Sequence, residues 1–323
     1  MTEAAMCLSR GAPITAAWCI ISLASPLWIR AYQRYSALYE VPVTTNNNAP
    51  GRLFDTPPIL EHKHYDSPSV FTPESLLREA RRQKALPPGQ VPTICALDPD
   101  GDLVDYLQRT GQARRHAAWA CYHTQLHTFA HEQIEYGIVG RVVGAPFAVL
   151  VAEELFASGC QLIISVTSAG QITPLGRTPY FVLIERALRD EGTSYHYLLP
   201  APYSTLRPEM AALTRAARED SGVSMYTGAT WTTDAPFRET AAMIEACRAN
   251  GILAVEMEAA ALYALAEAQQ RDIICFAHVT NQMAQEGEDF EKGPDQGSHA
   301  VLQVIGWTAR AWLQWHADDR RAD

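Results

Sequence analysis

The sequence predicts an α/β protein with three layers, in which helices lie on both sides of a mixed central β-sheet. Short apolar runs, such as residues 161–166, alternate along the chain with segments of helical periodicity, such as residues 146–158. This alternation is typical of β-strands joined by helices that cover both faces of a sheet. The chain has 323 residues, a length that permits one large domain or two ordinary ones.

The predicted elements follow one another regularly after about residue 70. The first helix starts at Thr72-Pro73-Glu74, because a Thr N-cap, a Pro at the first position and an early Glu complement the free amide groups. Further helices are predicted from residue 102, over 146–158, within 208–219, and over 239–248, 259–270 and 299–316. Strands are predicted at 91–97, 137–143, 161–166, 181–184, 229–233 and 272–280.

Small and polar residues follow four of the predicted strands, at 97–100, 143–146, 167–170 and 280–281. Ligands of such sheets bind at the carboxyl ends of the strands, so these segments form the predicted binding edge. None of them contains a GxGxxG pattern or a P-loop with its lysine. The sequence therefore argues against a dinucleotide or nucleoside triphosphate site, and we expect no cofactor.

Composition and charge exclude several function classes. Apolar residues make up 47% of the chain, which excludes a disordered protein. The 26 Lys and Arg residues against 36 Asp and Glu residues give a net charge of −10 without a dense basic cluster, which argues against a nucleic-acid partner. The seven cysteines are scattered without CxxC spacing. We therefore expect no disulfide framework, no metal site and a cytoplasmic protein with reduced thiols.

The amino-terminal part of the chain differs from the rest. The uncharged stretch at 11–29 permits a signal peptide or membrane anchor as one interpretation, and a variable extension as the favoured one. Residues 44–58 follow it as a polar linker rich in Pro and Asn. We therefore expect a variable or disordered extension at 1–57 and a single domain at 58–318, for which no membrane contact is predicted.

The segment AVEMEAAALY at 254–263 places acidic residues at the start of a predicted helix. Free amides of a first helical turn favour a carboxylate such as Glu258 in its ionised form, and its two oxygens can accept from the adjacent hydroxyls of a ribose cis-diol. Met257 offers a soft apolar surface for a sugar face. For an isolated ExE pattern the alternative is an ordinary helix start, where acidic residues favour the helix dipole.

Seven motifs in a fixed order resemble one family. They are DPD at 98–100, VGAPFAVLVAEEL at 143–155, SAGQI at 168–172, RDEGTSYHY at 189–197, TWTTDAPFRET at 230–240, AVEMEAAALY at 254–263 and HVTN at 278–281. Together they resemble the nucleoside phosphorylase and nucleosidase superfamily, which includes uridine phosphorylases, purine nucleoside phosphorylases and methylthioadenosine nucleosidases. The resemblance implies a nucleoside phosphorylase-like fold and cleavage of N-glycosidic bonds in nucleoside metabolism and salvage. It also implies a homo-oligomer, a dimer or a trimer of dimers, with sites at the subunit interfaces.

The resemblance further implies roles for individual residues around the sugar. Glu258 would bind the 2′ and 3′ hydroxyls, and Met257 would pack under the ribose. Glu256 would support their turn through backbone amides. Ser168 and Gly170 would face the nucleophile and the sugar. These residues form the predicted ribose site.

The base is expected beside Asn281, whose amide can donate to a carbonyl oxygen and accept from a ring N–H. This preference favours a keto base such as uracil or a 6-oxopurine. Asn281, Ser168 and Asp98 are the candidate catalytic residues, with Asp100 as the alternative to Asp98 for a catalytic acid. A donor to the departing base is required because cleavage leaves negative charge on it.

Two further segments complete the predicted site. Phe237 and Arg238 lie in the stretch that lines the base pocket in the family, although an ion pair of Arg238 with Glu239 is an equally good interpretation. His123 or His127 matches a histidine motif that reaches a neighbouring site. The resemblance therefore places part of each site on a second copy of the chain.

The sequence departs from the family where a phosphate clamp is expected. Such clamps are built from arginines because a guanidinium group grips two phosphate oxygens at once. The three expected positions hold Gly101, Thr124 and Ser165, so Arg141 and Ser168 are the candidate phosphate-binding residues. Phosphorolysis of a nucleoside with inorganic phosphate, which releases the free base, is the prediction. A water-dependent nucleosidase on the same site and a catalytically silent nucleoside-binding module are the alternatives.

Overall fold

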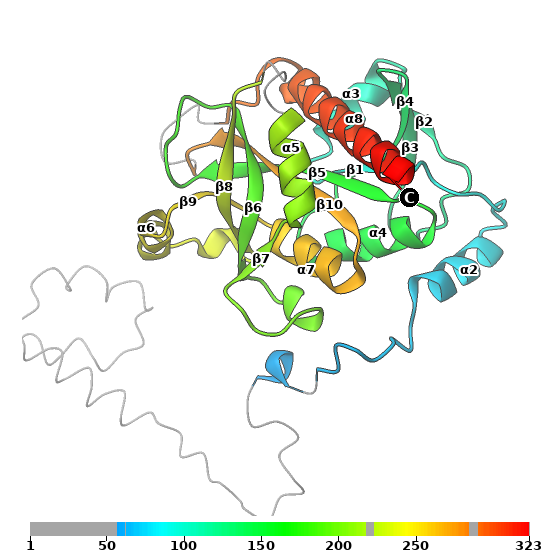
Figure 1. The fold of residues 1–323 in the computed structure, drawn as a ribbon, viewed down its shortest axis with the longest axis horizontal. Coiled ribbons are helices and arrows are strands. Elements are labelled where there is room, and N and C mark those ends of the chain that lie inside the picture. The colour runs from blue at the N-terminus through cyan, green and yellow to red at the C-terminus, as the bar shows by residue number, and fades with distance from the viewer. Residues whose placement is uncertain (1–56, 62, 218–222, 284–289, 323) are drawn as a thin grey trace, which may run out of the picture. The chain divides into compact units, whose positions relative to one another are not determined.

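The computed structural model describes residues 57–61, 63–217, 223–283 and 290–322 (Figure 1). The α-helices are α2 (Pro73–Gln83), α3 (Asp102–Arg109), α4 (Ala145–Ala157), α5 (Pro208–Ala217), α6 (Ala241–Ala249), α7 (Ala259–Gln269) and α8 (Ser298–Ala322). The strands are β1 (Ile94–Asp98), β2 (Arg114–Arg115), β3 (Leu126–His131), β4 (Ile134–Gly140), β5 (Leu162–Gln171), β6 (Tyr180–Asp190), β7 (Tyr203–Thr205), β8 (Met225–Thr233), β9 (Ile252–Glu256) and β10 (Asp272–Asn281). Short 3-10 helices are η3 (Pro58–Leu60), η4 (Ser194–His196), η6 (Pro236–Arg238) and η7 (Pro294–Gly297).

All of these strands belong to one mixed sheet. At its centre β1 lies parallel between β4 and β5, and β10 is parallel to β5. On its other side β10 pairs antiparallel with β6, which is parallel to β8, and β8 is parallel to β9. Because β9 pairs antiparallel with the end of β5, the strands β5, β10, β6, β8 and β9 close a ring.

Helices pack against one another in pairs around this sheet (Figure 1). α5 packs beside α8, and α4 packs between α7 and α2. α7 is buried along nearly its whole length, and its Tyr263 hydroxyl donates to the Ile184 carbonyl (2.5 Å) and accepts from the Cys275 amide (3.1 Å). These contacts fix α7 against β6 and β10. The predicted α/β class with a large mixed sheet is therefore confirmed.

Most predicted elements are present with shifted bounds. α2 begins after the predicted N-cap, with the Ser75 amide bonded to the Thr72 hydroxyl (3.3 Å). The strand predicted at 181–184 is the amino-terminal part of the longer β6, and the helix predicted at 299–316 extends to Ala322. β3 and β9 were not predicted: β3 mixes polar and apolar residues without regular alternation near the sheet edge, and the short β9 leads directly into the acidic turn before α7.

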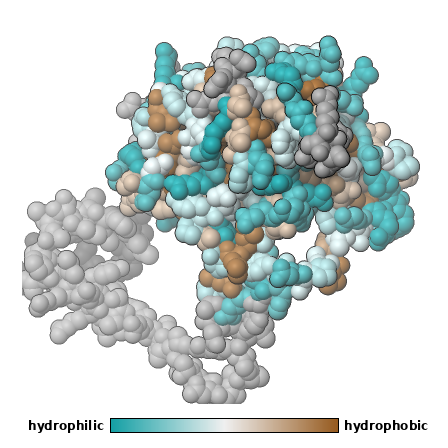
Figure 2. Space-filling model, viewed as in Figure 1, coloured by the Kyte–Doolittle hydropathy of each residue, from teal (hydrophilic) through white to brown (hydrophobic). Residues whose placement is uncertain are grey.

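The face of the described domain shown in Figure 2 is largely hydrophilic, with separate apolar patches. None of the helices in the described ranges is long and apolar enough to cross a membrane. The cysteines within those ranges, Cys95, Cys121, Cys160, Cys247 and Cys275, are buried and free. The predicted extension at 1–57, with its apolar stretch at 11–29, lies outside the described residues except for Pro57.

Candidate functional site

The carboxyl ends of four parallel strands meet at one edge of the sheet. The strand register places Asp98 of β1 beside Gly140 of β4, and His278 of β10 beside Ser168 of β5. Asn281 lies beside Gly170 after a register shift near the end of β10. The sequence prediction that these strand ends form one edge is confirmed.

Glu256 ends β9 and binds the first turn of α7. One carboxylate oxygen accepts from the amides of Glu258 (2.8 Å) and Ala259 (2.7 Å). The other accepts from the hydroxyls of Thr230 (3.1 Å) and Thr232 (2.5 Å). The predicted contact of Glu256 with backbone amides is present, and it gives the turn that carries Met257 and Glu258 a rigid base.

Glu258 lies beside the start of α4 and is 2% exposed. Its Oε1 accepts from the Gly144 amide (2.7 Å), and its Oε2 accepts from the Met257 amide at 3.3 Å. Burial, together with the charge of Glu256, raises the pKa of Glu258 to about 8, although the bonds from Gly144 and Thr167 act in the opposite direction. The first-turn amides of α7 bind Glu256 rather than Glu258, and the role of Glu258 at the ribose hydroxyls stays a prediction.

Asp100 forms a second acidic group at the same edge. Its Oδ2 accepts from both the amide (3.2 Å) and the hydroxyl of Ser168. Lys292 bridges Asp100 and Asp102, with its Nζ 3.1 Å and 2.5 Å from their carboxylates. The predicted nucleophile-facing donors of Ser168 are thus occupied by a carboxylate.

Asp98 is 7% exposed, and its Oδ2 accepts from the Val104 amide (2.9 Å) at the start of α3. Burial, reinforced by the charges of Asp100 and Asp102, raises the pKa of Asp98 to about 7. A carboxyl with such a pKa is suited to exchange a proton near neutral pH. This property fits the predicted acid at this position, and Asp98 as a catalytic residue stays a prediction.

A cavity of about 20 Å³ lies between these groups, lined by Asp98, Asp100, Asp102, Leu103, Val166, Thr167, Ser168, His278, Gln296, Ser298 and Val301. His278 is 4% exposed, and its ring stacks on Phe181 with 4.4 Å between centroids. Burial, with the nearby charge of Lys292, lowers the pKa of His278 to about 4. His278 therefore faces the cavity as a neutral imidazole.

Asn281 and Gly170 lie at the far end of this edge. The Asn281 carbonyl oxygen accepts from the Met283 amide (2.9 Å), and its Nδ2 is 3.5 Å from the Ala169 carbonyl. A Cβ added at Gly170 would be 2.3 Å from the Met283 sulfur, so Met283 covers Gly170 directly. Only glycine permits this close approach.

Residues 93–305 match the model of the phosphorylase superfamily. The chain belongs to this superfamily. It is 27% identical to the uridine phosphorylase of Thermococcus kodakarensis over 242 residues, which cover 69% of this chain and 86% of that protein. It is 26% identical to the guanosine phosphorylase of Halorubrum lacusprofundi over 181 residues, or 55% of this chain and 68% of that protein. A crystal structure of uridine phosphorylase from Vibrio fischeri shares the fold, with a TM-score of 0.57 and 18% identity over 71% of this chain and 94% of that one.

Arg141, the candidate phosphate-binding residue of this superfamily member, is engaged elsewhere. Its guanidinium binds both carboxylate oxygens of Asp105 (2.8 Å and 2.6 Å) and its side chain is 61% exposed. The amide of Arg141 donates to the Asp98 carbonyl (2.9 Å), which places its backbone at the edge while its side chain packs over Gly101. The geometry does not bring the Arg141 guanidinium to Ser168.

The segment predicted to line the base pocket forms a separate hollow. Phe237 is fully exposed in η6, and together with Glu239, Arg248 and Met283 it lines a cavity of about 550 Å³. Burial raises the pKa of Glu239 to about 7. Within the described residues no ion pair joins Arg238 to Glu239. Since Met283 also covers Gly170, this hollow borders the edge with Asn281.

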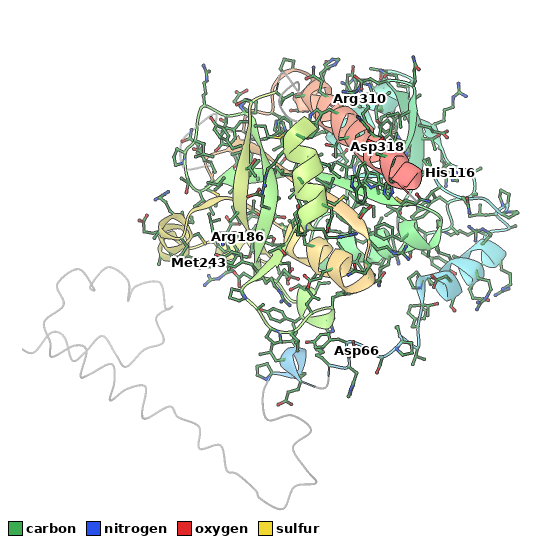
Figure 3. The ribbon with its side chains drawn as sticks, in the orientation of Figure 1. Asp66, His116, Arg186, Met243, Arg310 and Asp318 are labelled. Atoms are coloured by element: carbon green, nitrogen blue, oxygen red, sulfur yellow. The ribbon has the colours of Figure 1, made fainter. Side chains whose placement is uncertain are left out.

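His123 is not brought to this site within one chain. It lies before β3 and lines a cavity of about 640 Å³ together with His116, while β4 and β1 separate β3 from β5. Figure 3 shows His116 on the opposite side of the view from Met243 of α6, the helix next to Phe237. His127, the alternative, is buried in β3 and bonded to Gln108 (2.7 Å).

Lys292, His278 and Thr232 are the residues of this site to which the sequence assigned no role. His278 stands in the HVTN motif, so its place on the same strand as Asn281 was a usable signal. Lys292 follows a stretch with no motif, and it reaches Asp100 across 192 positions of the sequence. Its place depends on how η7 packs beside α3, which no local pattern in the sequence indicates.

Proposed function

We propose that this protein cleaves the N-glycosidic bond of a nucleoside. The observation that carries the proposal is the pair of buried carboxyls at the start of α7, with Glu256 binding the turn and Glu258 held by the Gly144 amide. The names of the uridine and guanosine phosphorylase relatives support a nucleoside substrate. Met257 is half-buried and lies between the two carboxyls in the sequence, and in the proposed complex it would contact the sugar face.

The arrangement suits the charges that develop as the bond breaks. Positive charge grows on the ribose, and negative charge grows on the departing base. The carboxylate of Glu258 would bind the ribose hydroxyls and stabilise the positive sugar. Asn281 would contact the base through its amide, which favours uracil or a 6-oxopurine.

The nucleophile is a separate question. The phosphorylase relatives support phosphate, with release of the free base and a sugar 1-phosphate. A second candidate, hydrolysis by water on the same site, is favoured by one observation: the Asp100 carboxylate occupies the amide and hydroxyl donors of Ser168. A phosphate ion would need those donors for its own oxygens.

Release of free base tests the proposed cleavage. The full chain is incubated with uridine, inosine, guanosine and methylthioadenosine in the presence of phosphate, and the base is quantified by chromatography. We expect release from at least one nucleoside, and Glu258→Gln should lower its kcat/KM by about tenfold to a hundredfold, since a hydrogen bond to a charged group contributes about 1.5–3 kcal/mol. The matched control is Glu267→Gln, an exposed carboxylate on the same helix. Saturable nucleoside binding without base release would instead support the silent module.

A homo-oligomer also stays a proposal, and the place of His123 supports it. Because His123 lies away from Glu258 in one chain, it can serve a site only by reaching that of a second copy. Light scattering of the purified protein should then report a dimer or a trimer of dimers. A monomer at micromolar concentration would leave His123 outside the site.

A further inference from the structure

We propose that the cavity beside β2 binds an organic phosphate monoester, at a place separate from the proposed nucleoside site. The cavity has a volume of about 640 Å³, which is a usual size for a small-molecule pocket. Its walls come from the end of α2, from β2 and from the loop that leads into β3. Because β4 and β1 separate β3 from β5, this cavity lies apart from the strand ends that carry Ser168 and Asn281.

The lining of this cavity is basic, in contrast to the chain as a whole. Four side chains that are or can become cationic line it: Lys84, Arg115, His116 and His123. Among the residues that the structure describes, no Asp or Glu lines it. The whole chain has 36 Asp and Glu residues against 26 Lys and Arg residues. A locally positive hollow on such a protein attracts anions that the remaining surface repels.

Arg115 is the exposed cation that is free to bind an anion. Its guanidinium forms no ion pair or hydrogen bond within the described ranges, whereas Arg109 and Arg141 are both bonded to aspartates. Burial, together with the charge of Arg115, lowers the pKa of His127, the residue that pairs with Arg115 on β3. The charge of Arg115 is therefore not neutralised by a neighbour. A free guanidinium can bind two oxygens of one phosphate group.

Lys84 is held at the same cavity by neutral groups. Its Nζ donates to the Cys121 carbonyl (2.5 Å) and to the Ala120 carbonyl (3.3 Å). Its charge also acts on Glu154, a carboxyl of α4 that is 1% exposed and does not line the cavity. Burial raises the pKa of Glu154, which reduces the negative charge available to offset the ammonium. Lys84 therefore adds to the positive charge around Arg115.

His116 adds a ring nitrogen that has no partner. Its Nδ1 is buried and makes no hydrogen bond to any described residue. Buried polar atoms in proteins are nearly always hydrogen-bonded, so this nitrogen needs an explanation. The His116 amide donates to the Leu126 carbonyl (2.8 Å), which fixes the residue next to Arg115. A ligand oxygen that accepts from Nδ1 would satisfy the ring.

The aromatic part of the wall favours a phosphate ester over inorganic phosphate. Tyr122 lines the cavity with a side chain that is 39% exposed, and Lys84 Nζ lies 4.8 Å from its ring centroid. The Trp119 indole donates to the Thr124 hydroxyl (2.9 Å) and so holds the loop. A planar organic group can pack on Tyr122 while its phosphate reaches Arg115. A free phosphate would leave most of the cavity unfilled.

Binding of phenyl phosphate to the full chain tests the inference, because this monoester has no ribose for the nucleoside site. Calorimetry compares phenyl phosphate, inorganic phosphate and phenol. We expect saturable binding of phenyl phosphate, weaker binding of inorganic phosphate and none of phenol. Equal affinity for inorganic phosphate would overturn the choice of an ester, and equal affinity for phenol would overturn the role of the phosphate group. If phenyl phosphate does not bind, the whole inference fails, while glycosidic cleavage, which this measurement does not involve, is unaffected.

Variants of β2 show whether the ligand occupies this cavity. Arg115→Gln should weaken phenyl phosphate binding by about tenfold to a hundredfold, the usual effect of a lost hydrogen bond to a charged group. Arg115→Lys keeps the charge without the two-pronged geometry, so we expect a smaller loss. The matched control is Arg114→Gln: Arg114 is the exposed neighbour in the same strand and does not line the cavity, since successive strand residues point to opposite faces. Unchanged binding in Arg115→Gln, or an equal loss in Arg114→Gln, would show that the ligand binds elsewhere.

Discussion

At Glu258, burial and the neighbouring groups act on the pKa in opposite directions. Burial and the charge of Glu256 raise it to about 8, while the Gly144 amide and Thr167 lower it. The group is therefore mainly protonated at neutral pH, whereas a ribose diol is bound best by the ionised form with its two acceptor oxygens. In the proposed complex, nucleoside binding would therefore be coupled to proton release at Glu258.

This coupling predicts a pH dependence of nucleoside affinity. Below a pKa of about 8, the ionised fraction falls tenfold for each pH unit, so affinity should fall by up to about tenfold per unit as the pH is lowered from about 8 to about 6. Titration calorimetry in buffers of different ionisation enthalpy measures both the affinity and the released proton. Glu258→Gln should bind more weakly with a flat profile. A pH-independent affinity of the unmodified protein would contradict the assignment of Glu258 to the diol.

Gly170 predicts a steric effect. In Gly170→Ala the new Cβ would lie 2.3 Å from the Met283 sulfur and 3.2 Å from Val255, so Met283 must move away from the edge. Overpacking of this kind costs about 1–3 kcal/mol of unfolding free energy, and we expect KM for the nucleoside to increase as well. Urea denaturation measures the first effect. The double variant Gly170→Ala with Met283→Ala removes the clash and should recover part of the loss; if it recovers none, the contact is not the cause.

At the scale of elements, Thr232 joins β8, β9 and α7. Its hydroxyl donates to Glu256 (2.5 Å) and accepts from the Ala260 amide (3.0 Å), and the residue is completely buried. Thr232→Val keeps the shape but leaves a carboxylate oxygen and a helix amide without this partner. We expect the unfolding free energy to fall by about 1–3 kcal/mol. Thr232→Ser, which keeps the hydroxyl and lacks only the methyl group, should lose clearly less, and an equal or larger loss in Thr232→Ser would show that the hydroxyl bonds are not the main contribution.

The elements also show how far local pattern determines this fold. The N-cap at Thr72 and the buried strands β1, β5 and β10 were predictable because capping and apolar runs are local signals. β9 was missed because this short strand ends at Glu256, directly before α7. Its last residues were therefore interpreted as part of the helix start. β3 was missed because its mixed sequence has no regular strand pattern. Its pairing with β2 and β4 holds it in the sheet.

The residues of the candidate site also divide into those that local sequence indicates and those that only long-range packing brings together. The acidic turn before α7 is local, so Glu256 and Glu258 were predictable as a pair. The contact of Asp100 with Ser168 joins positions 68 apart, and it determines which group binds the Ser168 hydroxyl. Long-range contacts of this kind depend on the packing of the whole sheet. The sequence therefore indicated the turn of Glu256 and Glu258 more completely than the contact of Asp100 with Ser168.

The whole molecule has a net charge of −10, and carboxyl groups are also concentrated at the candidate site. Several carboxyls lie buried or half-buried near one edge of the sheet, and burial raises the pKa of Asp98, Glu256 and Glu258. A folded protein that holds protons on buried carboxyls binds more protons than its unfolded chain. The site therefore lowers the stability of the fold as the pH rises, in contrast to the usual surface carboxylate.

This difference predicts the pH dependence of unfolding. Folding raises the pKa of Asp98 from 3.8 to about 7 and that of Glu258 from 4.5 to about 8. The contribution of the two protonated groups to the unfolding free energy is therefore complete below the unfolded-state pKa values. It is lost as the pH rises through the folded-state pKa values. The pKa of His278 is lowered from 6.5 to about 4, so its contribution to the unfolding free energy falls as the pH drops below 6.5. This effect opposes that of the two carboxyls only below pH 6.5. We therefore expect the unfolding free energy from urea denaturation to fall most steeply between about pH 6.5 and about pH 8.

Asp98→Asn separates this contribution from the rest, because the amide oxygen can still accept from the Val104 backbone and the group no longer titrates. The slope of unfolding free energy against pH should become shallower between about pH 4 and about pH 7, while Asp66→Asn at the surface should leave it unchanged. A stability that rises from about pH 6.5 to about pH 8 in the unmodified protein would contradict the protonated state of these carboxyls. It would also remove the argument that the sugar end of the site releases a proton when a nucleoside binds.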